Sequence, residues 1–152
     1  MSYNKSKNEL TNKKISEEDK AKEKYNKKIG DIKFNRGINF SIEYLKTDDI
    51  NYIKFENMEY KPNAKNITLY YSEEYNSFNS IVFEIDDDTK FKTTDLTKQL
   101  TKKYKLDLVV REIEMAHQEY KEELISIEKK YENIENQSIM KEPELELKKG
   151  NN

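Results

Sequence analysis

The sequence predicts an α+β fold, with an antiparallel sheet in the middle of the chain and helices on either side. Apolar and polar residues alternate over much of the region between about 31 and 92, and apolar residues recur every third or fourth position from 109 to 134. Residues 1–30 are instead charged and poor in apolar side chains. We expect a short N-terminal helix, a four- or five-stranded sheet over about 31–92, and a long C-terminal helix over about 94–136.

The first helix is predicted from capping signals. Ser16 and Asp19 have the spacing of an N-cap residue and its acidic partner, and Gly30 stands where a C-cap glycine ends a helix. Because this segment offers few apolar residues to bury, we expect the helix to be short.

The first two strands are predicted as a hairpin. Ile32 and Phe34 lie in the same two-residue phase as Ile38 and Phe40. The intervening residues 35–37 have the length of a three-residue hairpin loop, whose glycine takes the left-handed position.

The later strands show the same alternation with one irregularity. Phe55 and Met58 lie in opposite phases, which predicts a bulge or bend near Asn57. Alternation resumes over 67–71 and again over 81–85, with a polar turn between the two segments. These patterns predict antiparallel strands with one apolar face.

The C-terminal helix carries the strongest pattern in the sequence. Cap-type residues at 93–95 precede it, and one alternative is a break near residue 105. Residues 105–110 fit a helix or a short strand, and we favour the helix. A continuous helix over 94–136 would be about 65 Å long, against about 20 Å for a strand. Either the helix breaks, or its far end pairs with a second chain in a homodimer. The expected self-association stripe is Ile113, Tyr120, Leu124, Ile127, Tyr131 and Ile134.

Composition limits the size of the packed core. Of 152 residues, 34% are hydrophobic and 38% are charged, a low apolar content for a globular domain. We therefore divide the chain into a basic N-terminal helix or arm (1–30), a single α+β domain (31–136) and a flexible C-terminal tail (137–152). No stretch approaches the roughly 18 apolar residues of a membrane span or resembles a signal peptide. We expect a cytoplasmic protein with no membrane contact.

Catalytic and metal-binding motifs are incomplete. The chain has no Cys and one His. Glu114 and His117 have the three-residue spacing of a di-iron ligand pair, but such sites need two pairs, so we expect His117 to be a surface residue beside the stripe. An aspartate-nucleophile phosphotransfer motif starting at Asp86 would need threonine where Lys90 stands. We assign no catalytic residue, metal ligand or cofactor, and an enzyme using carboxylates and a divalent metal is the third choice of function.

Charge is strongly segregated along the chain. Residues 1–30 have a net charge of +4, residues 66–89 of −6 and residues 90–105 of +5. The favoured explanation is neutralisation of the acidic hairpin by lysines of the following helix, each exposed pair being worth about 0–1 kcal/mol. The alternative is a docking surface for a basic partner. The acidic hairpin comprises Glu73, Glu74, Glu84, Asp86, Asp87 and Asp88.

We therefore expect a non-enzymatic protein-interaction or regulatory module. The excess of Lys over Arg within 28 basic residues is typical of AT-rich genomes, which suits the cytoplasm of a low-GC bacterium or the host of a phage. On this hypothesis the chain is a phage or mobile-element accessory protein that binds a basic, nucleic-acid-handling host protein. The alternative is a single-stranded nucleic-acid-binding protein whose sheet face stacks bases and holds phosphates. Its residues would be Tyr52, Lys54, Tyr60, Lys61 and Tyr70.

Overall fold

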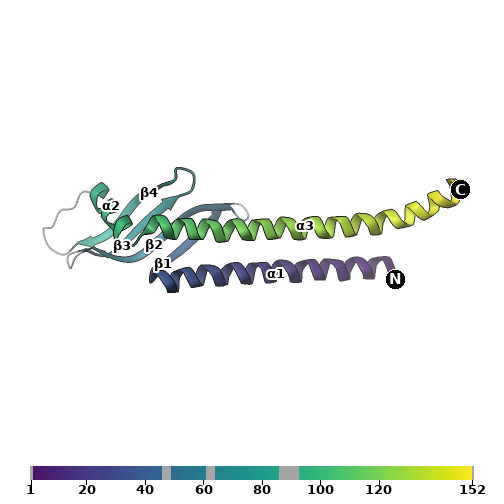
Figure 1. The fold of residues 1–152 in the computed structure, drawn as a ribbon, viewed down its shortest axis with the longest axis horizontal. Coiled ribbons are helices and arrows are strands. Elements are labelled where there is room, and N and C mark those ends of the chain that lie inside the picture. The colour runs from purple at the N-terminus through teal and green to yellow at the C-terminus, as the bar shows by residue number, and fades with distance from the viewer. Residues whose placement is uncertain (1, 46–48, 61–63, 86–92, 152) are drawn as a thin grey trace. The chain divides into compact units, whose positions relative to one another are not determined.

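A computed structural model describes residues 2–45, 49–60, 64–85 and 93–151 of the chain. Its elements are, in order, α1 (Ser2–Arg36), β1 (Asn39–Leu45), β2 (Asp49–Tyr60), β3 (Ala64–Ser72), β4 (Ser77–Ile85), α2 (Thr93–Lys103) and α3 (Leu106–Asn151) (Figure 1). The four strands form one antiparallel sheet in the order β1-β2-β3-β4. The predicted α+β class with an antiparallel sheet is confirmed.

The chain divides into two compact units. The sheet unit comprises residues 28–116, and the helical unit comprises residues 1–27 together with 117–152. The long helices α1 and α3 each contribute residues to both units. Each unit has its own cluster of buried apolar side chains.

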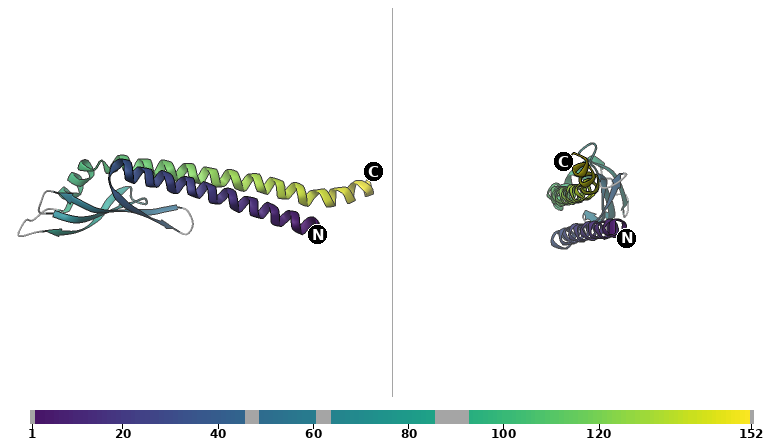
Figure 2. Two further views of the ribbon diagram at one scale, coloured as in Figure 1. Left: turned by 90° about the horizontal axis from the view of Figure 1, so that it is seen from below. Right: turned by 90° about the vertical axis from the view of Figure 1, so that its right-hand side faces the viewer.

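The core of the sheet unit lies between one face of the sheet and three helical segments, which are the end of α1, helix α2 and the start of α3. Helices α2 and α3 contribute Leu100 and Ile113, and the sheet contributes Phe55, all of which are fully buried. Figure 2 (left) shows α2 and the first turns of α3 on the same side of the sheet. The core also contains Ile32, Ile38, Phe40, Ile50, Ile53, Met58, Ile67, Leu69, Tyr71, Leu96, Leu106, Val109 and Val110.

The predicted hairpin over 32–44 is wrong in its first half. Residues 32–36 belong to α1, and the sheet begins only at Asn39. Ile32 is buried while Phe34, two residues later, is 87% exposed, because two residues on a helix point about 200° apart, not to the same face as on a strand. Ile32 and Phe34 therefore matched the two-residue alternation of β1 only by chance.

Gly37 ends the helix instead of forming a hairpin loop. Its φ of 61° places it in the left-handed region, and the amide of Ile38 donates to the carbonyl of Lys33 at 3.2 Å. This is the geometry of a Schellman C-cap. The prediction that Gly30 caps a short helix is wrong, because α1 continues through Gly30 and is 35 residues long.

The bulge predicted near Asn57 is confirmed. The β2–β3 register changes between the pairs Phe55 with Leu69 and Met58 with Ile67. Asn57 itself has a φ of 55°. The extra residue in β2 returns both Phe55 and Met58 to the buried face despite their opposite phases.

The helix predicted over 94–136 breaks at the expected place. Helix α2 ends at Lys103 and α3 begins at Leu106, so the residues from 106 are helical, as favoured. The expected end near residue 136 is wrong, because α3 continues to Asn151 through most of the expected tail (137–152). That segment is rich in Glu, Lys and Leu, which have high helix propensity.

Replacing Lys105 with glycine is expected to stabilise the sheet unit. Lys105 lies between the two helices with a φ of 53°, a conformation that costs a residue with a Cβ roughly 1–2 kcal/mol and costs glycine almost nothing. We expect the unfolding free energy to rise by about 1 kcal/mol, measured by urea denaturation. In the control, Lys98→Gly inside α2 is expected to lower it by about 0.5–1 kcal/mol. Destabilisation by both substitutions would contradict the left-handed conformation of Lys105.

In the helical unit, α1 and α3 run antiparallel and pack through one apolar seam (Figure 1). Ala21 of α1 and Ile127 and Tyr131 of α3 are buried in this seam. The rings of Tyr25 and Tyr120 stack with centroids 4.8 Å apart. Ion pairs join the helices beside the seam: Lys14 Nζ to Glu128 Oε2 at 2.6 Å, Lys130 Nζ to Glu17 Oε1 at 2.9 Å and Lys24 Nζ to Glu123 Oε2 at 3.9 Å.

The predicted surface position of His117 is also wrong. It was expected at the surface, but it is 8% exposed. Its ring centroid lies 6.0 Å from that of Tyr25 on α1. The imidazole therefore packs in the helical unit as part of an aromatic cluster, where its apolar ring edges contribute to the seam.

Candidate interaction surface

The structure describes only part of the predicted acidic hairpin. Glu73 and Glu74 lie in the turn between β3 and β4, with Glu74 exposed and Glu73 half-buried. The side chain of Glu84 and residues 86–88 (Asp86, Asp87 and Asp88) lie outside the described part of the chain. Whether this hairpin binds a basic partner or is neutralised by neighbouring lysines thus stays a prediction.

Glu73 forms a carboxyl pair that the sequence did not indicate. The pKa of Glu73 is raised to about 7. The main cause is partial burial, and a hydrogen bond with Glu114 of α3 and the charge of Glu114 add to it. Tyr71 lies in the same place, and burial together with the charges of Glu114, Glu73 and Asp107 raises its pKa to about 12. The Tyr71 hydroxyl donates to Asn76 Oδ1 at 3.2 Å. A hydrogen bond between the Glu73 and Glu114 carboxyls thus joins the turn after β3 to α3.

The predicted self-association stripe packs against other residues of the same chain, with Ile113, Ile127 and Tyr131 buried and the other three residues partly buried. Ile113 belongs to the core of the sheet unit. The other five residues, Tyr120, Leu124, Ile127, Tyr131 and Ile134, lie in the apolar seam of the helical unit with Ala21 and Leu10 of α1. The stripe therefore has an apolar partner without a second chain, and the homodimer stays a prediction.

The second face of the sheet presents aromatic and charged side chains. Cross-strand pairs place Glu43 beside Tyr52, Ser41 beside Lys54, and Lys54 beside Tyr70. Residues paired in this way on antiparallel strands point to the same face. All of these side chains are exposed or half-buried, in contrast to Ile53, Phe55 and Leu69 on the opposite face. We call the surface formed by Glu43, Tyr52, Lys54, Glu56 and Tyr70 the tyrosine face.

The side chains of the tyrosine face contact one another. The Tyr52 and Tyr70 rings meet edge to face, with centroids 5.4 Å apart and planes at 72°. The Tyr52 hydroxyl donates a hydrogen bond to Glu43, which is the main reason that the pKa of Tyr52 is raised. Lys54 Nζ lies 3.1 Å from Glu56 Oε1, and this hydrogen bond raises the pKa of Lys54. The face is therefore ordered by its own contacts.

Three of the five residues expected to bind nucleic acid thus come together. Tyr52, Lys54 and Tyr70 are neighbours on this face, while the side chains of Tyr60 and Lys61 lie outside the described part of the chain. The carboxylates of Glu43 and Glu56 beside them were not among the predicted site residues. Glu43 and Tyr52 lie on different strands, and they become neighbours only because β1 pairs with β2 in this register.

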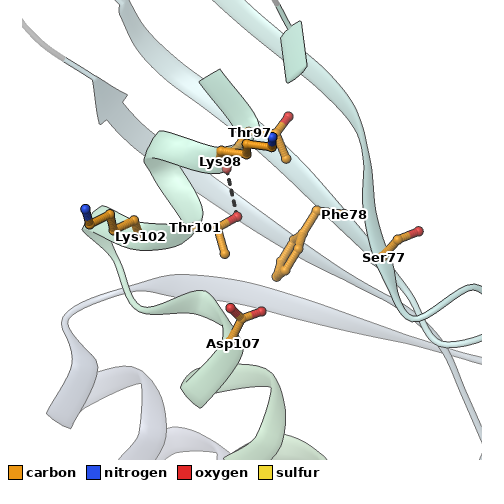
Figure 3. A pocket seen from close by; sticks show the side chains of 7 residues that line it. All are labelled: Ser77, Phe78, Thr97, Lys98, Thr101, Lys102 and Asp107. Atoms are coloured by element: carbon orange, nitrogen blue, oxygen red, sulfur yellow. Dashed lines mark hydrogen bonds between the residues drawn. The ribbon is translucent and has the colours of Figure 1, made fainter. Parts of the chain in front are cut away.

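A separate open cavity of about 490 Å³ lies in the sheet unit (Figure 3). The ring of Phe78 faces it from β4, and Asp107 points toward it from the start of α3. The Thr101 hydroxyl donates to the carbonyl of Thr97 at 2.7 Å along its α2 wall. The remaining lining residues are Ser77, Lys98 and Lys102.

The described residues offer no metal-binding cluster to accompany this cavity. They contain no group of three or more His, Cys, Asp or Glu side chains arranged to hold a metal ion. Within the same residues, no helix is both long and apolar enough to cross a membrane. The chain matches no protein-family model, no curated protein and no solved structure.

Proposed function

We propose that the chain is a non-enzymatic protein-interaction module that binds a positively charged partner through the tyrosine face. The observation that carries this proposal is a sheet with helices packed on one face and two contacting tyrosines on the other. Tyrosine is enriched in protein interfaces because it buries a large ring and still offers a polar hydroxyl. A basic, nucleic-acid-handling host protein, bound by a phage or mobile-element accessory protein, fits this charge preference.

Charge on the face favours a protein over a nucleic acid. Glu43 and Glu56 give two negative charges against one positive charge from Lys54, which Glu56 already neutralises. Nucleic-acid affinity depends mainly on lysines and arginines that replace counterions at phosphates. A phosphate on this face would meet two carboxylates, so we favour a protein partner. Base stacking on Tyr52 and Tyr70 is the second candidate, because these rings lie together beside Lys54.

Photocrosslinking from the tyrosine face tests the proposal. We would replace Thr68, a half-buried residue of β3 that lies two positions from Tyr70 and so on the same face, with benzoylphenylalanine and express the full chain in its native host. The expected result is a crosslink to one protein that disappears, or falls at least fivefold, when Tyr52 and Tyr70 are both changed to serine. Mass spectrometry of the crosslinked band identifies the partner, whose surface should be basic.

Two further crosslinking positions distinguish binding at the tyrosine face from binding at the acidic hairpin and from background. The same photoreactive residue at Tyr75, which is 69% exposed in the turn beside Glu74, reports on the acidic hairpin. At Lys129, an exposed residue of α3, it measures background crosslinking. A crosslink from Tyr75 alone would move the binding surface to the hairpin. A crosslink from Thr68 to nucleic acid, with a mobility shift that weakens steeply with salt, would replace the proposal with the second candidate.

A further inference from the structure

We infer that the tyrosine face recognises an arginine side chain of the basic partner. This inference rests on the proposed function and adds the chemistry of the bound group. It follows from three features of the face: an ordered aromatic pair, a carboxylate already oriented beside it, and a lysine held by its own counterion.

The aromatic pair supplies the surface on which a cation can stack. Tyr52 and Tyr70 are half-buried and hold each other edge to face at 5.4 Å. Because their rings are already fixed, a ligand that stacks on them costs little side-chain entropy. The negative face of an aromatic ring attracts a cation, and arginine is found in this position more often than lysine.

Glu43 supplies the matching anion. It accepts the hydrogen bond of the Tyr52 hydroxyl, which fixes the carboxylate next to the ring. A carboxylate has about four lone-pair sites, so Glu43 can also accept from a guanidinium. The planar guanidinium donates two parallel hydrogen bonds and stacks on a ring at the same time, which a lysine ammonium does not do.

Lys54 is placed so that it does not repel this cation. Its ammonium lies 3.1 Å from Glu56 Oε1, and Glu56 thus cancels its charge at short range. Among the described side chains of this face, the carboxylate of Glu43 lies beside the aromatic pair without a lysine or arginine in an ion pair with it. Its charge is complementary to a cationic side chain and opposed to a phosphate or a carboxylate.

Peptide titration with the full chain tests the inference. The probes are three capped extended peptides of the same length, in which threonine alternates with arginine, lysine or glutamate. In two-dimensional NMR we expect the arginine peptide to shift the amides of Tyr52 and Tyr70, to bind at least threefold more tightly than the lysine peptide, and to show a greater preference over the glutamate peptide. Both Tyr70→Leu and Glu43→Gln are expected to weaken arginine-peptide binding at least threefold.

The control is Glu74→Gln, which removes the same charge from an exposed residue of the β3–β4 turn. It should leave binding of the arginine peptide within about 1.5-fold of the parent protein, because Glu74 is not part of the tyrosine face and a single exposed charge contributes little. Equal affinity for the arginine and lysine peptides, or equal losses in Glu43→Gln and Glu74→Gln, would overturn the inference.

The two experiments distinguish a failure of arginine recognition from a failure of the proposed function. If Thr68 crosslinks a protein through the tyrosine face while the arginine peptide does not bind, the interaction module stands and arginine recognition is wrong. If Thr68 gives no protein crosslink, the proposed function fails together with the inference.

Discussion

Replacing Phe55 with alanine is expected to lower the unfolding free energy of the sheet unit by about 3–5 kcal/mol. Phe55 is fully buried and packs between the rings of Phe40 and Phe78, at centroid distances of 5.9 and 6.2 Å. Alanine would leave a cavity that the surrounding strands and helices cannot fill by small movements. A domain of this size has roughly 5–15 kcal/mol of stability in total, so the sheet unit would be close to unfolding at 37 °C.

Circular dichroism during urea denaturation measures this loss, and Tyr52→Ala is its matched control. Tyr52 also belongs to β2 but points to the opposite face, where it is half-buried. Its removal forfeits the edge-to-face contact with Tyr70, which we expect to cost only about 0.5–1.5 kcal/mol. Similar losses from the two substitutions would contradict the assignment of the two faces and, with it, the exposed tyrosine face.

Local sequence patterns indicated the two places where a single residue changes the direction of the backbone. The bulge at Asn57 could be predicted because a change of phase within a strand requires an extra residue. A break near Lys105 was one of the two outcomes expected from a helix pattern longer than the sheet, and the structure shows it together with a long α3. Both positions have positive φ values.

The same reasoning failed where two periodicities fit one segment. Ile32 suits a strand with Ile38, and it equally suits a helix with Ile29, which packs on the same core. The continuous helix is favoured because the few apolar residues of α1, such as Ala21 and Tyr25, pack against a second helix, α3. That partner lies about a hundred residues away in sequence, so local patterns do not contain it.

The candidate site was predictable in its residue types but not in its arrangement. The tyrosines and Lys54 could be placed on one face from their alternation along β2 and β3. Glu43 could not be added to them, because the β1–β2 register has a shift after that residue. Likewise, His117 could be placed near the apolar stripe but not inside the seam, since its burial depends on Tyr25 of α1.

Glu73 should make the stability of the sheet unit fall as pH rises. Its pKa is raised from the ordinary value of 4.5 to about 7, by burial first and by Glu114 second. Between these two pH values the folded chain holds a proton that the unfolded chain has lost. The stabilising contribution of the protonated carboxyl is therefore complete below pH 4.5, and it is lost as pH rises through 7. Besides Glu114, the acidic groups at this place are Asp107 of α3 and the Tyr71 hydroxyl of β3.

The Glu73→Gln variant is accordingly expected to be more stable than the parent protein at pH 8, by about 1–2 kcal/mol. A full pKa unit corresponds to about 1.4 kcal/mol, and water around this half-buried side chain reduces the effect. At pH 4.5 the difference should nearly vanish, because Glu73 is then protonated in the folded protein and already resembles glutamine. Urea denaturation at half-unit pH steps from 4.5 to 8.5 measures both limits. Glu74→Gln, an exposed change one residue away, should give a curve parallel to that of the parent. A stability gain for Glu73→Gln that is independent of pH would mean that the pKa of Glu73 is not raised in the folded protein.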